Sequence, residues 1–244
     1  MEHKTALITG ASRGIGRAIA LKFAAKGYDL AITASKSAHE LAATAEEIRA
    51  MHVACRPFLA DASSYEAMQE VFAQLGRDWG TPTILVNNAG IAALGLFTDQ
   101  TPSGYGRIIA VNLLSVMHCC HLAVPGMVRR GAGRILNISS IWGICGASCE
   151  AAYSAAKSGV NGFTRALAKE LAPSGIAVNA LACGVVDTGM NREELNEEEL
   201  TTLTQEIPAG RMASPQEAAD AAWQLVNSPA YLTGQVIALD GGFV

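Results

Sequence analysis

Tyr153 and Lys157 stand four residues apart in the segment Tyr153-Ser-Ala-Ala-Lys157. On a helix this spacing places both side chains on one face, one turn apart. A phenol normally loses its proton near pH 10, which is too high for a general acid or base at neutral pH. A cation about 4 to 5 Å away favours the phenolate by up to about 3 to 4 kcal/mol at an effective dielectric constant of 20. The pair could therefore exchange a proton with a substrate, although the same spacing also suits an ordinary surface pair.

The rest of the chain alternates short β-rich stretches with longer helical patterns, and Tyr153 falls in one of the helical stretches. Such alternation predicts right-handed crossovers and a parallel sheet. We expect one Rossmann-type doubly wound α/β domain over residues 1–244, with about seven parallel strands and helices on both faces. The expected strands are 6–9, 30–33, 54–59, 84–87, 135–139, 177–182 and 235–239, and the expected helices are 15–25, 38–51, 65–75, 103–130, 151–171 and 215–226.

Composition excludes several classes of protein. Of 244 residues, 50% are hydrophobic and 16% are charged, and the net charge is −4, so neither a disordered chain nor a nucleic-acid-binding surface is expected. The sequence shows no signal peptide and no apolar run of membrane-spanning length, which predicts a cytoplasmic protein with no membrane partner. Its six cysteines are scattered, which predicts reduced and mostly buried thiols. His118-Cys-Cys-His121 has no second ligand pair at zinc-like spacing, so no metal site is expected.

Four motifs follow different strands of the expected sheet. Thr9-Gly10-Ala-Ser-Arg13-Gly14-Ile-Gly16 offers a tight turn that a pyrophosphate can approach closely at the start of a helix. Asn87-Asn88-Ala89-Gly90 supplies small residues, Asn137-Ile-Ser139-Ser140 supplies a hydroxyl, and the stretch from Cys183 to Thr188 supplies a flexible loop. Each motif alone could be an ordinary turn or cap. The absence of a G-x-S-x-G elbow argues against a hydrolase.

The acid-rich stretch 191–207 precedes the final expected helix. Because it follows the carboxyl end of a strand, where open α/β sheets bind ligands, we expect it to form a substrate lid. The alternative is a solvated helix face.

Taken in order, the motifs TGxxxGxG, NNAG, Ser and YxxxK resemble the short-chain dehydrogenase/reductase family over the whole chain. The resemblance implies that Tyr153 is the general acid/base and that Lys157 lowers its pKa and bonds the nicotinamide ribose. It also implies that Asn112 supports Lys157 through a bound water. Both Ser139 and Ser140 precede Tyr153 by a number of residues that the family allows for the serine that polarises the substrate carbonyl. We choose Ser140 because Ser140-Ile-Trp-Gly143 matches the family pattern.

The resemblance implies a nicotinamide cofactor. Ala34 occupies the position where members that use NAD carry an acid, and Arg13, Ser35 and Lys36 could bind a 2′-phosphate, so NADP(H) is expected in preference to NAD(H). Arg13 and Lys36 could alternatively be solvated surface charges. The residues expected to bind the cofactor are Gly10, Ser12, Arg13, Gly14, Ile15, Gly16, Ser35, Lys36, Asp61, Ala62, Asn88, Ala89, Gly90, Tyr153, Lys157, Gly184, Val186 and Thr188.

Within the family, the chain is most similar to the 3-oxoacyl-[acyl-carrier-protein] reductase branch. That branch implies a 3-oxoacyl thioester substrate and fatty acid biosynthesis, with an acyl carrier protein as a further partner. Gly131 and Ser174 fall where the branch carries docking arginines, and Cys183 replaces the usual proline before Gly184. The alternatives are a dehydrogenase of a hydroxysteroid, sugar or small ketone, and a catalytically silent dinucleotide-binding sensor.

The same resemblance bears on the substrate pocket and on assembly. The pocket wall is expected from 91–97, 141–149 and 186–206, mostly apolar and small. Relatives pair the helices that match 103–130 and 151–171 across a two-fold axis, and Ala155, Ala156, Gly159 and Gly162 would permit close approach. We therefore expect a homotetramer.

Overall fold

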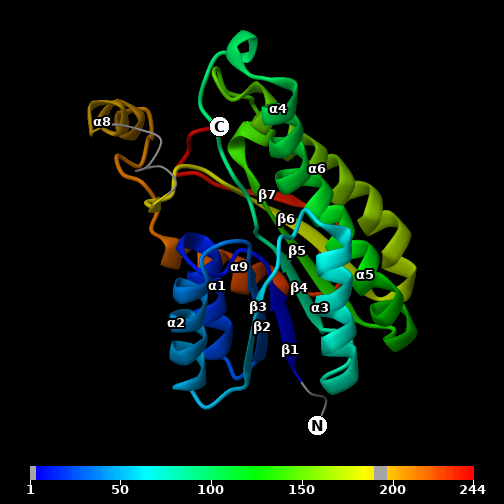
Figure 1. Ribbon diagram of the computed structural model, residues 1–244. Helices are drawn as coiled ribbons and strands as arrows, with labels where there is room; N and C mark the ends of the chain where they lie inside the picture. The colour runs from blue at the N-terminus through cyan, green and yellow to red at the C-terminus, as the bar shows by residue number, and fades with distance from the viewer. Residues whose placement is uncertain (1–3, 190–196) are drawn as a thin grey trace.

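A single sheet of seven parallel strands forms the centre of the structure, a computed structural model that describes residues 4–189 and 197–244 (Figure 1). The strand order is β3-β2-β1-β4-β5-β6-β7, and every neighbouring pair is parallel. The order reverses between β1 and β4, which is the switch point where doubly wound sheets bind ligands. The predicted fold class is confirmed. The strands are β1 (Thr5–Ile8), β2 (Asp29–Ala34), β3 (Cys55–Leu59), β4 (Ile84–Asn87), β5 (Gly133–Ser140), β6 (Ile176–Cys183) and β7 (Val236–Leu239).

Helices cover both faces of the sheet (Figure 1). Side chains alternate across a strand, so Leu7 and Leu85 enter one core and their neighbours Ile8 and Val86 enter the other. One core packs against α1, α2 and α9, and the opposite core packs against α3, α5 and α6. The bounds are α1 (Gly14–Ala24), α2 (Ala38–Arg49), α3 (Tyr65–Asp78), α4 (Pro102–Ile109), α5 (Ser115–Arg130), α6 (Ala151–Leu171), α8 (Glu197–Gln205) and α9 (Pro215–Val226).

The expected long helix at 103–130 is interrupted by a π-helical turn at Ala110–Leu114, between α4 and α5. The sequence pattern carried no sign of this turn, and such turns are frequent at functional sites. By length and composition alone the stretch Pro102–Arg130 is long and apolar enough to cross a membrane. It is not an uninterrupted apolar run, because Arg107, Asn112 and His118 lie within it. In the fold its α5 portion packs against β4, β5 and α3 as a helix of the core.

The strand register brings the motifs to one edge of the sheet. Asn87 pairs with Asn137, and Ser140 pairs with Cys183, so the ends of β4, β5 and β6 are neighbours. The amide of Asn87 donates to Asn137 Oδ1 over 2.8 Å, and both residues are buried. This edge carries the candidate site. Of the expected lid, the structure describes 197–207, which contains α8, and residues 191–196 lie outside the described residues.

Candidate active site

The glycine-rich turn between β1 and α1 is shaped by close backbone contacts. A Cβ on Gly16 would lie 2.2 Å from the Gly10 carbonyl oxygen, so only glycine fits there. Gly10 itself has φ +66°, and its carbonyl accepts a hydrogen bond of 2.9 Å from the Asn88 amide. Asn88, from the Asn87–Gly90 motif, thus holds the glycine-rich turn in place by a hydrogen bond. The amino end of α1 faces the edge of the sheet.

A cavity of about 520 Å³ runs along this edge. Every residue expected to bind the cofactor lines it, from the glycine-rich turn to Thr188. A helix amino terminus, closely approachable glycines and several cations suit a dinucleotide diphosphate. The residues present therefore fit a nicotinamide dinucleotide.

At the far end of this cavity, β2 ends at Ala34 and is followed by Ser35 and Lys36. Asp61, two residues after the neighbouring strand β3, accepts a hydrogen bond of 2.7 Å from Arg107. Burial acts to raise the pKa of the Asp61 carboxyl, but hydrogen bonds from Ser63 and Arg107 and the Arg107 charge outweigh it, and that pKa lies below its usual value. Arg107 also lines the cavity. Sequence reasoning missed it because a single arginine on a helix carries no motif.

Tyr153 and Lys157 meet the end of β5 at the other end of the cavity. The Tyr153 hydroxyl is hydrogen-bonded to the Ser140 side chain. Lys157 Nζ donates to the Ile138 carbonyl over 2.9 Å and lies 5.6 Å from the centre of the Tyr153 ring. The structure thus brings together three residues that the sequence predicted to act together.

The protonation states differ from the prediction that Lys157 lowers the pKa of Tyr153. Burial raises the pKa of Tyr153 above its usual value, the Glu150 charge raises it further, and the Ser140 hydrogen bond only partly offsets them. Burial also lowers the pKa of Lys157 to about 8. Burial of the phenol and the Glu150 charge therefore act against the pKa shift that the resemblance implies. In this structure Tyr153 therefore holds its proton at neutral pH.

The two candidate serines point to different partners. Ser139 Oγ donates to Asn161 Oδ1 over 2.7 Å and is buried between β5 and α6. Ser140 Oγ accepts a hydrogen bond of 3.1 Å from the Trp142 amide and contacts the Tyr153 hydroxyl. The geometry favours Ser140 as the hydroxyl that would face a substrate.

Asn112 sits in the π-helical turn and is fully buried. Its amide nitrogen donates to the Ile91 carbonyl over 2.8 Å and to the Ile108 carbonyl over 3.0 Å. A Cβ on Gly90 would lie 2.8 Å from Asn112 Oδ1 and 3.8 Å from Lys157 Nζ. Gly90 therefore separates the two side chains, and Asn112 fixes the loop beside Lys157.

Cys183, at the end of β6, also lines the dinucleotide cavity. Burial raises the pKa of its thiol to about 12, although the Lys157 charge acts in the opposite direction. The thiol is therefore neutral beside the candidate catalytic pair. All six cysteines are free, and four are buried, whereas Cys145 is exposed and Cys149 is half-buried.

A second cavity of about 720 Å³ opens on the other side of Tyr153. Ser140, Tyr153 and Gly184 line both cavities. Its wall draws on the expected stretches, including Leu94 and Trp142, and more of its surface is apolar than polar, as expected. It also contains Phe243 from the carboxyl terminus and four carboxylates, of which only Glu150 lies outside the expected stretches. The carboxylates are Glu150, Glu198, Glu199 and Glu206.

The family model for short chain dehydrogenases matches residues 4–199. The chain belongs to this family. It is an oxidoreductase, and its family binds a nicotinamide dinucleotide, as the geometry of the first cavity indicates.

Known short-chain dehydrogenases resemble this one over nearly its whole length. An uncharacterized oxidoreductase of Bacillus subtilis is 40% identical over 248 residues, covering 99% of each chain. A 3-oxoacyl-[acyl-carrier-protein] reductase of Staphylococcus aureus is 40% identical over 247 residues, covering 98% of this chain and 97% of its own. The crystal structure of a putative gluconate dehydrogenase from Agrobacterium tumefaciens superposes with a TM-score of 0.94 at 34% identity, covering 98% of this chain and 95% of that one.

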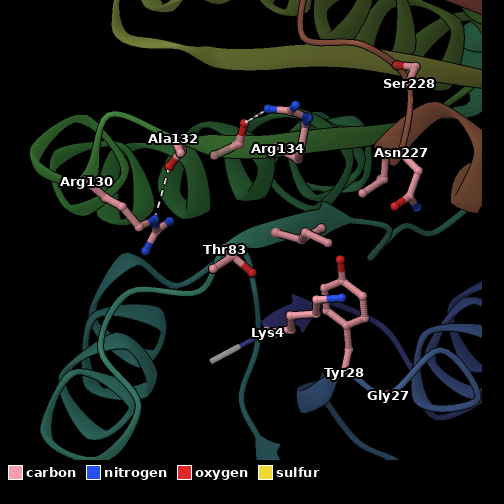
Figure 2. Close-up of a pocket in the computed structure, with 12 residues that line it drawn as sticks. Lys4, Gly27, Tyr28, Thr83, Arg130, Ala132, Arg134, Asn227 and Ser228 are labelled. Carbon is pink, nitrogen blue, oxygen red and sulfur yellow. Dashed lines mark hydrogen bonds between the residues drawn. The ribbon is translucent and has the colours of Figure 1, made fainter. Parts of the chain in front are cut away.

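This short-chain dehydrogenase has a further cavity of about 770 Å³ at the opposite, amino-terminal edge of the sheet (Figure 2). Lys4, Arg130 and Arg134 line it, and Lys4 Nζ lies 5.8 Å from the centre of the Tyr28 ring. Arg130 donates to the carbonyls of Thr81, Pro82 and Ala132, and Arg134 donates to the Gly133 carbonyl. Through these bonds Arg130 links the segments that lead into β4 and β5. Neither the glycine-rich turn nor Tyr153 lines this cavity.

Proposed function

We propose that the protein is an NADP(H)-dependent reductase that converts a carbonyl into a secondary alcohol, with Tyr153 as proton donor. The observation that carries the proposal is the shared wall of the two cavities, where Ser140 and Tyr153 face both sides. A dinucleotide in one cavity and a carbonyl compound in the other would meet at these hydroxyls.

When bound, the nicotinamide supplies the hydride. The chain supplies orientation and a proton. Ser140 Oγ, fixed by the Trp142 amide, donates its hydrogen to the substrate oxygen and holds it beside the Tyr153 hydroxyl. Tyr153 keeps its proton at neutral pH and releases it as negative charge develops on the oxygen. Lys157 places a cationic group close to that phenol and to the dinucleotide wall.

The preference for NADP(H) over NAD(H) is supported by the end of β2. Ala34 presents no carboxylate that would repel a 2′-phosphate, and Lys36 and Arg13 line the same end of the cavity. Asp61, which follows the neighbouring strand β3, is paired with Arg107. Electrostatics therefore favour the cofactor with the additional phosphate.

For the substrate, we propose a 3-oxoacyl thioester, because a relative at 40% identity is named a 3-oxoacyl-[acyl-carrier-protein] reductase. An acyl carrier protein is then the natural carrier, although Gly131 and Ser174 offer no charge for it. The second candidate is oxidation of a sugar or another secondary alcohol, which the similarity to a putative gluconate dehydrogenase supports.

We also propose a homotetramer that acts in the cytoplasm. Leu114, Met117 and Val128 expose large apolar side chains on the surface around α5, and Ala155 and Gly162 are exposed on α6. Ala156, in contrast, is buried in this chain's own core, and Gly159 packs against Leu113. A second copy of the chain would cover the exposed residues around α5 and on α6.

The test is the loss of NADPH absorbance with acetoacetyl thioesters, simple ketones and hydroxysteroids. Tyr153→Phe keeps the ring and removes the transferable proton, so kcat should fall by about 10² to 10⁴ while NADPH affinity stays within a few-fold. If no substrate is turned over although NADPH binds, the protein is a dinucleotide sensor. If Tyr153→Phe retains more than roughly a tenth of wild-type turnover, Tyr153 is not the proton donor.

A further inference from the structure

The substrate cavity carries four carboxylates: Glu150, Glu198, Glu199 and Glu206. No lysine, arginine or histidine is found among the described residues that line it. Glu150 immediately precedes α6 and lies near enough to Tyr153 for its charge to act on the phenol. The other three come from α8 and the residue after it, so the carboxylates approach the cavity from two separate segments.

The sequence that surrounds this wall carries more negative than positive charge. The stretch 190–206 contains six glutamates and one arginine, so its net charge is negative whatever its internal pairing. The positive end of the α6 dipole acts in the opposite direction, but it amounts to about half a charge. The described residues that line the cavity therefore carry a net negative charge.

The dinucleotide cavity is charged in the opposite sense. Arg13, Lys36, Arg107 and Lys157 line it, with Asp61 as the single carboxylate among its described lining residues. Phosphates are thus attracted to one side of Tyr153, while the side that receives the substrate repels anions. The two walls meet at Ser140, Tyr153 and Gly184.

We infer that these carboxylates set the substrate class, so that the cavity takes neutral or cationic carbonyl compounds and rejects those with a carboxylate or phosphate near the reacting group. The inference rests on the proposed function for what is turned over. A unit charge about 10 Å from one carboxylate changes association by roughly twofold to fifteenfold, for effective dielectric constants between 80 and 20. Several carboxylates acting together would give about a tenfold or larger preference for cation over anion.

Cys145 allows the field to be measured without turnover, because its exposed thiol lines the same cavity. The thiol is modified with two methanethiosulfonates of similar size, one carrying a trimethylammonium group and one a sulfonate. Tandem mass spectrometry separates Cys145 from Cys149 within one peptide. The ratio of the two rate constants is divided by the same ratio for free N-acetylcysteine amide.

We expect this normalised ratio to exceed about five at low ionic strength and to fall toward one in 0.5 M salt, where the Debye length is about 4 Å. Glu150→Gln/Glu206→Gln should lower the ratio. Glu170→Gln removes an exposed charge from the far end of α6 and should leave it unchanged. A normalised ratio below five in the unmodified protein, or an equal response to Glu170→Gln, would overturn the inference.

Turnover of a matched series then tests the substrate class. The series is 4-acetylbenzoate, its neutral methyl ester and 4-(aminomethyl)acetophenone, which share one reacting ketone. We expect kcat/KM for the anion to be at least about tenfold below that of the other two, with the gap narrowing in Glu150→Gln/Glu206→Gln. Equal kcat/KM for anion and ester refutes the inference and leaves the reductase intact. If none of the three is reduced while the Cys145 ratio stays high, the acidic field is upheld, and the reductase proposal is then decided by the panel of acetoacetyl thioesters, simple ketones and hydroxysteroids.

Discussion

Replacing Lys157 with methionine should make the protein inactive but more stable at neutral pH. Lys157 is only 4% exposed, and its ammonium group is held by one hydrogen bond, to the Ile138 carbonyl. Burial lowers its pKa from 10.5 to about 8, so at pH 7 the folded chain contains a poorly solvated positive charge. Methionine has a similar length and no charge to desolvate.

The magnitude follows from the two pKa values. The difference between 10.5 and about 8 corresponds to about 3 kcal/mol of destabilisation by the charged form. Loss of the hydrogen bond to Ile138 offsets about 1 to 2 kcal/mol of this gain. Lys157→Met should therefore raise the free energy of unfolding at pH 7 by about 1 to 2 kcal/mol.

The gain should depend on pH in a defined direction. The pKa of Lys157 is lower in the folded state, so between about pH 8 and 10.5 the unfolded chain binds more protons than the folded chain. Wild-type stability therefore rises by about 3 kcal/mol through this window relative to the variant, whose advantage of about 1 to 2 kcal/mol should vanish near about pH 9 and reverse toward pH 10.5.

The assay is urea unfolding at fixed protein concentration from pH 7 to 10, with NADPH oxidation measured in parallel. Lys169→Met, on the exposed face of the same helix, is the matched control and should show no such trend. The reasoning is refuted if Lys157→Met is no more stable than wild type at pH 7, or if the difference between them is independent of pH.

Three further predictions test the cofactor, the serine and the assembly. NADPH should bind at least about tenfold more tightly than NADH, and Ala34→Asp should reverse this by repelling the 2′-phosphate; equal binding of both by the wild type would contradict the charge argument. Ser140→Ala should lower kcat with little change in NADPH affinity, and Ser139→Ala should be milder because its hydroxyl bonds Asn161; the reverse order would exchange their roles. Light scattering at micromolar concentration should give a tetramer, and a monomer would show that the exposed α5 side chains have another purpose.

The fold could be predicted from the sequence because parallel strands buried on both faces are continuous apolar runs. Ala177–Ala182 lies wholly inside β6, every residue of which is buried. Strand ends were less well predicted, as β5 begins two residues before the expected 135. The π-helical turn at Ala110–Leu114 could not have been foreseen, because it depends on the bonds that Asn112 makes with a distant loop.

The site was predictable where a motif fixes the backbone. The glycine-rich turn and Tyr153 with Lys157 lie where their spacing placed them, since close packing at Gly16 and the helical period leave little freedom. Protonation was not predictable, because it depends on how completely the fold encloses the side chains. Arg107 and Phe243 were missed for a related reason: each reaches its cavity from a segment that has no motif of its own.

The opposed charges of the two cavities bear on the direction of the reaction. Tyr153 lies at their boundary, where burial and the Glu150 carboxylate both raise its pKa. A phenol in this setting retains its proton at neutral pH, which is the state required to protonate an oxygen that receives a hydride. Oxidation of an alcohol would require the phenolate, which the same carboxylate disfavours. In the proposed reaction, burial and then the Glu150 carboxylate therefore move the pH range in which Tyr153 could act as a base upward and leave its acid form available near neutral pH.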